Sequence, residues 1–329
     1  MNIQYFGEQL IWGHLGRLLV VLSFTASMLA ACSFWFAVKT GDKSWRSLAR
    51  KSFYLHAGSV TGIAVLLIYL IVKHRFEYYY VWEHSNTQMP LRYILSCLWE
   101  GQEGSFLLWT FWHCVLGTII IRTSGEWEES VMTIFSIVQV FLASMILGVV
   151  VFNYKIGSNP FTLLREHPDF ANLPFIKMPD YLQKLHDGRG LNPLLQNYWM
   201  TIHPPTLFLG FALTVVPFAY AIAALWKRNY QGWIKPALPW AFCGVMVLGI
   251  GILMGGIVIQ FETATWEKFD GILLVGAMLL LAFVLLPGIG HAVNGSARWV
   301  GVGPIRIQAS EVAKFAIVIY MSGYLFRQN

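Results

Sequence analysis

Long apolar runs with few charges recur along this 329-residue chain, and they constrain its fold more than any other feature. A run of about 20 apolar residues can cross the hydrocarbon core of a membrane as a helix. The runs lie near 18–38, 53–72, 105–121, 131–152, 206–226, 238–260, 271–287 and 310–326. Because backbone polar groups inside lipid must bond within their own segment, we predict that each run is a helix. The expected fold is all-α: a polytopic integral membrane protein with about eight transmembrane helices.

The composition excludes a soluble domain. Hydrophobic residues make up 56% of the chain and charged residues only 12%, against about 25% charged in ordinary soluble domains. The net charge of +6 comes from basic residues that lie between apolar runs, which indicates membrane topology rather than a nucleic-acid surface. The four cysteines show no C-x-x-C spacing, so neither a disulfide framework nor a zinc site is expected.

The connector after the first run carries the densest basic cluster of the chain. It contains Lys39, Lys43, Arg46, Arg50 and Lys51 with a single acid, Asp42. Short basic loops stay in the cytoplasm, so we place this connector inside and the N-terminus outside. No cleavable signal peptide is evident, because the first run is too long for one. The expected location is the bacterial inner membrane, in which the chain is multi-pass and membrane lipid is its immediate partner.

By alternation, segment 153–205 forms one large extracytoplasmic loop. It is rich in proline and aromatic residues, and proline removes backbone donors. We therefore expect a shaped functional loop rather than a hidden pair of helices.

Polar and glycine-rich patches stand at the ends of the apolar runs. They are Trp99–Ser105 (WEGQEGS), Gly157–Phe161 (GSNPF), Gly190–Gln196 (GLNPLLQ) and the Ile202–Pro205 segment (IHPP). The prolines after His203 are favoured in the first turn of a helix, which predicts that His203 lies where loop becomes span. A neutral imidazole there can ligate iron. Each patch also has an ordinary explanation. The glycine and Asn-Pro motifs can be tight turns, and His203 can be a histidine that binds no metal. For His56 and His113, within or beside the runs, a buried structural hydrogen bond is the expected role.

Taken in order, these motifs resemble the CcmF branch of the cytochrome c assembly family over residues 1–256. The matching segments are SNTQMPLRYILSCLWEGQEGSFLLW, GSNPF, GLNPLLQ and IHPPTLFLGFALTVVPFAYAIAAL. The resemblance implies haem handling at the extracytoplasmic face, with haem b as cofactor and His203 as the ligand of the haem iron. It also implies delivery to apocytochrome c, together with other haem-delivery and thiol-reduction components. The implied cofactor-binding residues are His203, Pro204, Pro205, Trp99, Glu103 and Gly104.

The chain departs from that family pattern at several places. Glu100 replaces a usual glycine and Gln102 a frequent histidine. After Gly256 no tryptophan-rich W-x-W-D run follows, and no second haem histidine. The family's activity, that of a haem lyase component, is therefore expected to be incomplete, and no residue is assigned a catalytic role.

Residues 257–329 resemble a second family, the FtsW/RodA polymerases of lipid II. The resemblance rests on PGIG, VNGSARW, GPIRIQASE and AKF. It predicts a two-helix fragment joined by a compact loop. The implied contacts to lipid-linked disaccharide pyrophosphate are Asn294, Arg298, Trp299, Glu311 and Lys314. The alternative for Glu311 and Lys314, three residues apart on one helical face, is a local ion pair.

Two families in one chain predict a chimera joined within 245–262. The domains are then 1–256, a cytochrome c assembly-like domain, and 257–329, an FtsW/RodA-like fragment. Haem handling in cytochrome c maturation is the leading function, because that resemblance covers most of the chain. The alternatives are a peptidoglycan glycosyltransferase fragment of cell division and an inert fusion.

Overall fold

A computed structural model describes residues 5–152, 154–191, 196, 198–260, 275–276, 278, 290–293, 296–302 and 305–308. The chain divides into two compact units, Met1–Gly251 and Ile252–Asn329. Each unit is described below by itself.

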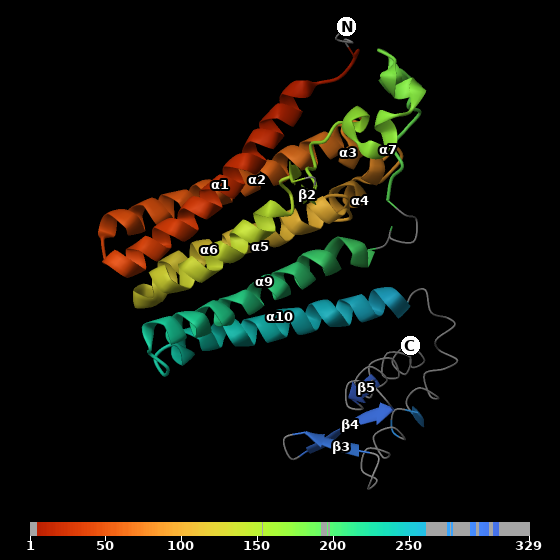
Figure 1. The fold of residues 1–329 in the computed structure, drawn as a ribbon. Helices are drawn as coiled ribbons and strands as arrows, with labels where there is room; N and C mark the ends of the chain where they lie inside the picture. Colours follow the sequence, from red (N-terminus) through yellow and green to blue (C-terminus); the bar gives the residue numbers. More distant parts are fainter. Residues whose placement is uncertain are drawn as a thin grey trace. The chain divides into compact units, whose positions relative to one another are not determined.

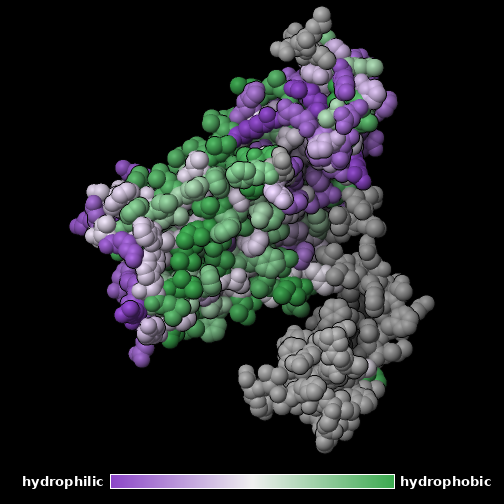
Figure 2. Space-filling model, in the orientation of Figure 1, coloured by the Kyte–Doolittle hydropathy of each residue, from purple (hydrophilic) through white to green (hydrophobic). Residues whose placement is uncertain are grey.

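Five helices of the described residues are long and apolar enough to cross a membrane. They are α1 (Leu10–Thr40), α2 (Lys43–Val72), α5 (Gln102–Thr123), α9 (Tyr198–Lys227) and α10 (Ile234–Gln260). In the first unit they run side by side as a bundle (Figure 1). Hydrophobic residues cover the middle of this bundle and hydrophilic residues gather at its two ends (Figure 2). The protein is thus the mostly helical, polytopic membrane protein that the sequence predicts.

The fourth predicted span, 131–152, is wrong in its second half. Helix α6 (Glu128–Ser144), preceded by the 3-10 turn η1 (Gly125–Trp127), has 17 residues, or about 26 Å at 1.5 Å per residue. The rest of the run forms a hairpin of β1 (Val149–Val151) and β2 (Tyr154–Ile156). Three consecutive valines favour a strand. Gly148 precedes that strand at φ +67°, in the left-handed region that glycine adopts most readily. The predicted spans 271–287 and 310–326 fall almost entirely outside the described residues.

Two apolar clusters hold the bundle together. One joins α1 and α2 to the connectors after them, and the other joins α5, α6 and α9 to α1 and α2. His56 links three helices, because its Nδ1 lies 2.9 Å from the Ser23 carbonyl of α1 and its Nε2 lies 3.0 Å from Oε1 of Gln139 in α6. The structural role expected of His56 is confirmed. The same expectation is wrong for His113, which is buried beside Phe135 with neither ring nitrogen hydrogen-bonded within the described part of the chain.

The polar end of the bundle carries short helices rather than regular spans. They are α3 (Tyr79–His84), α4 (Leu91–Ser96), η2 (Leu164–Glu166), α7 (Pro168–Ala171), η3 (Pro174–Lys177) and α8 (Tyr181–Lys184). Pro168 and Pro174 each begin a short helix, where a missing amide costs nothing. The segments pack around Leu164, Ile176 and Tyr181. The described residues of 154–191 thus form a shaped loop, as the proline and aromatic content predicts, but the predicted loop 153–205 is too long because residues 198–205 belong to α9.

The described part of the second unit contains an antiparallel sheet in the order β3-β4-β5. Its strands are β3 (Gly290–Val293), β4 (Ser296–Val302) and β5 (Ile305–Gln308). The strands were not predicted. Asn294-Gly295, a strong turn signal in the sequence, lies between two β-prone runs, and such a pair favours a two-residue hairpin. Val293 and Ser296, on either side of this pair, are partners in the ladder.

Candidate functional site

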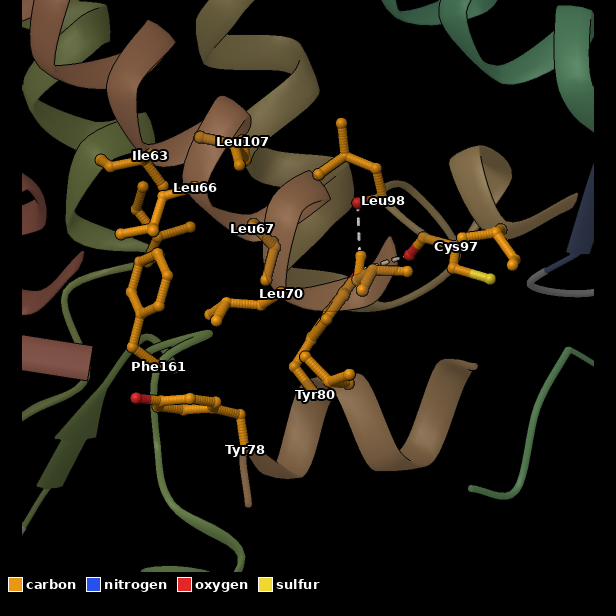
Figure 3. Close-up of a cluster of buried hydrophobic side chains, with 14 of the residues drawn as sticks. Ile63, Leu66, Leu67, Leu70, Tyr78, Tyr80, Cys97, Leu98, Leu107 and Phe161 are labelled. Carbon is orange, nitrogen blue, oxygen red and sulfur yellow. Dashed lines mark hydrogen bonds between the residues drawn. The ribbon is translucent and has the colours of Figure 1, made fainter. Parts of the chain in front are cut away.

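Tyr80 organises the turn that carries Trp99. Its hydroxyl donates to the carbonyls of Cys97 and Leu98, at 3.0 Å each, as Figure 3 shows. The same hydroxyl accepts from the amide of Gly101 at 3.3 Å. Burial raises the pKa of Tyr80 well above its ordinary value, so the hydroxyl keeps its proton and remains a donor. The turn between α4 and α5 is closed by this one side chain.

The two glycines of this turn are required by close packing. A Cβ on Gly104 would lie 1.6 Å from the Leu98 carbonyl oxygen and 2.2 Å from the Tyr80 hydroxyl. A Cβ on Gly101 would lie 2.5 Å from Nε2 of His84. His84 in turn lies 3.4 Å from Glu100 through its Nδ1. The glycine pair therefore lets the turn approach α3.

Helix α9 begins earlier than the sequence predicts. It starts at Tyr198, five residues before His203, and contains Pro204 and Pro205 in its interior. A helical proline cannot supply the amide that bonds to the carbonyl four residues earlier. For Pro204 that carbonyl belongs to Met200, and the indole Nε1 of Trp99 donates to it at 3.1 Å. The side chain of Trp99 thus takes the place of the missing backbone donor.

A second contact joins the same two segments. The hydroxyl of Ser96, at the end of α4, lies 3.1 Å from the hydroxyl of Thr201 in α9. Thr201 is four residues before Pro205, so its carbonyl also lacks a helical amide donor. The structure therefore joins the segment that carries Trp99 to the first turn of α9, the helix that carries His203.

His203 is half-buried, and its Nδ1 is buried without a hydrogen-bond partner among the described residues. A buried polar atom without a partner costs about 1–3 kcal/mol, and a bound ligand is one way to satisfy it. Glu103 is half-buried in the first turn of α5, and none of the described ion pairs or hydrogen bonds joins it to His203. Within the described residues no group of three metal-ligating side chains forms. One imidazole nitrogen fits an axial position of haem iron.

The remaining motifs have structural roles. In GSNPF, Oδ1 of Asn159 accepts from the Phe161 amide at 3.0 Å, and the Phe161 ring lies where a Cβ on Gly16 of α1 would be. In GLNPLLQ, Gly190 has φ +78° and lies against Asn86. Sequence reasoning missed Tyr80 and Ser96, and only the aromatic run 78–80 hinted at a packing site.

The C-terminal candidates form no described site. Arg298 and Trp299 lie in β4. Asn294, Glu311 and Lys314 fall outside the described residues.

Comparisons with known proteins identify relatives for both parts of the chain. The cytochrome c-type biogenesis protein CcmF of Haemophilus influenzae is 32% identical over 244 residues, which are 73% of this chain and 34% of that protein. CcmF of Pseudomonas fluorescens is 32% identical over 246 residues, with the same two shares. The chain is homologous to CcmF over most of its length. It spans about a third of the length of these CcmF proteins.

A solved structure of the cytochrome c haem lyase CcmF has the same fold. The TM-score is 0.59 at 21% identity, over 99% of this chain and 48% of the CcmF chain. At this identity the match shows the fold alone.

A second family matches the C-terminal part of the chain. The FtsW, RodA and SpoVE family model, described as "Cell cycle protein", matches residues 206–329. The probable peptidoglycan glycosyltransferase FtsW of Saccharophagus degradans is 44% identical over 85 residues, which are 26% of this chain and 22% of that protein. The family match begins inside α9, upstream of the expected boundary at 257.

Proposed function

We propose that residues 1–256 handle haem in cytochrome c maturation at the extracytoplasmic end of the bundle. The observation that carries the proposal is the buried Nδ1 of His203, without a described partner, at the polar end of an apolar helix. The homology to CcmF supports it. Apocytochrome c and the components that deliver haem or reduce thiols are the proposed partners.

His203 would supply the axial nitrogen, and it must be neutral to do so. His203 would hold the haem, which, when bound, would supply the iron centre and the group to be joined to the cysteines of the apocytochrome. Trp99 and Ser96 are positioning residues, because they act on the backbone and side chain of α9 rather than on haem. Pro204 and Pro205 fix the backbone conformation beside His203. Gly104 allows the turn after α4 to pack against Tyr80, and Glu103 provides a carboxylate at the start of α5. Haem b is the proposed form, as the resemblance to CcmF implies.

Haem titration of the purified full-length chain tests the proposal. We expect the absorption bands of added haem to shift as it binds, and a pyridine haemochrome assay of the chain as purified from cells to identify haem b. Binding is expected to be weak, because a single axial histidine is proposed. A chain that leaves the spectrum of free haem unchanged at all concentrations would show that residues 1–256 do not handle haem.

We further propose that the chain is a chimera of 1–256 and 257–329, joined within 245–262. The division of the chain at Gly251 and Ile252 supports this proposal, as does the similarity of 85 residues to FtsW. The alternative function, glycan polymerisation or lipid II binding by Asn294, Arg298, Trp299, Glu311 and Lys314, rests on that similarity alone. Reading the genomic DNA across codons 245–262 tests the junction, and an uninterrupted reading frame at that locus, found in independent isolates, would contradict an accidental fusion.

The orientation of the bundle is also part of the proposal. We expect the α1–α2 connector inside and the loop 153–197 outside, because the connector holds the basic cluster. A cysteine at Asp180 should react with a membrane-impermeant maleimide in intact cells, and one at Ser44 only after permeabilisation. The wild-type chain, which keeps its four cysteines, is the background control. Labelling of position 44 in intact cells would reverse the orientation.

A further inference from the structure

The first three turns of α2 present a continuous cationic face. Lys43, Arg46, Ser47, Arg50, Lys51 and Tyr54 line an open pocket of about 320 Å³. Their spacing of three and four residues places all six on one side of the helix. Four of the six side chains are basic, so the pocket is suited to an anionic ligand.

Two of these cations are offset by acids of α6. Nε and one terminal nitrogen of Arg50 bond to the carboxylate of Glu128 at 2.6 and 2.5 Å, and Arg46 pairs with Glu129. Lys43 and Lys51 have no carboxylate partner among the described residues. Arg46 also has a buried Nε without a hydrogen-bond partner in that part of the chain. The pocket therefore keeps positive charge and unsatisfied donors after its internal ion pairs are formed.

Aromatic residues place this pocket at the level of lipid headgroups. Phe36 and Trp45 stack at 4.9 Å between ring centroids. Lys39 lies 5.9 Å from the ring of Trp35 and 6.0 Å from that of Trp226. Tryptophans collect at the membrane–water interface, and here they belong to α1, α2 and α9. The hydrophilic end of the bundle meets its hydrophobic band here (Figure 2).

Exposed apolar side chains continue from the pocket along α2. Tyr54 is 39% exposed, and Val65, eleven residues further along the same face of the helix, is 62% exposed. A ligand in the pocket therefore has cations at one end and an apolar surface at the other. This combination fits a lipid better than a free anion, because a free anion gains nothing from the apolar side chains.

We propose that this pocket binds the phosphate headgroup of an anionic phospholipid, with its acyl chains along Tyr54 and Val65. Lys43 and Lys51 supply the net charge, while Arg46 and Ser47 donate to the phosphate oxygens. Clusters of basic residues at the end of a transmembrane helix bind anionic headgroups by this chemistry. The site is independent of the haem proposal and stands at the α1–α2 connector, whichever side of the membrane that connector faces.

The test measures lipid retention by the full-length chain in nanodiscs of phosphatidylglycerol and phosphatidylcholine, using native mass spectrometry. The double variant Lys43→Gln, Lys51→Gln should retain phosphatidylglycerol about ten- to thirtyfold less well, since each basic residue near the surface contributes several-fold. Lys43→Arg with Lys51→Arg should retain it as the wild type does. The matched control is Arg228→Gln with Lys235→Gln, two exposed cations at the same end of the bundle, in the α9–α10 connector and the first turn of α10 (Figure 1).

Each outcome decides the proposal. Equal retention by the Gln double variant and the wild type overturns it. An equal loss in the Arg228 and Lys235 control also overturns it, because the effect would then come from general surface charge. Displacement of the lipid by inorganic phosphate at equal concentration would show a free-anion site. A loss confined to the Lys43 and Lys51 variant, with circular dichroism unchanged, supports the lipid site.

Discussion

Gly104→Ala is expected to prevent stable folding of the first unit. The added Cβ would lie 1.6 Å from a backbone oxygen, which cannot move aside as a flexible side chain can. It would also displace the Tyr80 hydroxyl, which makes two hydrogen bonds at the same turn. Overpacking of this kind costs about 3 kcal/mol or more. Thermal unfolding in detergent, followed by circular dichroism, should show a clearly lower Tm or no cooperative transition.

Gly58→Ala is the matched control for this experiment. Gly58 is an exposed helical glycine of α2, and a Cβ there would meet nothing within 4 Å. Alanine is favoured over glycine in a helix, so the control should unfold at or slightly above the wild-type temperature. If Gly104→Ala matches Gly58→Ala, the turn is not closed by the contact between Gly104, Leu98 and Tyr80.

His203→Ala is expected to abolish the shift that the full-length chain causes in the absorption spectrum of haem. The reason is that His203 is the proposed haem ligand. Its Nδ1 has no hydrogen-bond partner among the described residues. Absorption spectra of wild type and variant, titrated with haem at equal protein concentration, measure the effect. Added imidazole should restore part of the shift, because it can fill the space that the substitution leaves.

The control for this second variant is His113→Ala. His113 is also buried without a hydrogen-bond partner among the described residues, but it lies within α5 beside Phe135. Its removal should leave the shift unchanged. An undiminished shift in His203→Ala, or a lost shift in His113→Ala, would show that the ligand has been assigned to the wrong histidine.

The apolar runs predict the membrane helices well, because length and hydropathy are local properties of the chain. They mislead at 131–152, where hydropathy alone cannot separate a helix from the valine-rich hairpin that follows α6. Whether a buried histidine finds a hydrogen-bond partner is not a local property of the sequence either. His56 finds Gln139 across 83 residues of sequence, whereas His113 finds no such partner in the described structure, and no feature near either residue predicts the difference.

Part of the candidate site follows from the sequence. The motif containing Trp99 and the IHPP motif are visible as patterns, and the structure brings them together. The manner of contact is not visible in the sequence. It depends on α9 starting before His203, because this places Pro204 inside the helix. The Met200 carbonyl then accepts a hydrogen bond from the indole of Trp99 on another segment.

Because the indole of Trp99 replaces a backbone donor in α9, the conformation of the start of α9 depends on residues of another segment. In a helix without prolines, the backbone hydrogen bonds of the helix alone would fix the position of His203. Here it depends on Trp99 as well, and Trp99 depends on the turn closed by Tyr80 and Gly104. A mutation a hundred residues upstream can therefore alter His203 without touching it. Substitutions in the turn after α4 and at the start of α9 are therefore expected to depend on one another.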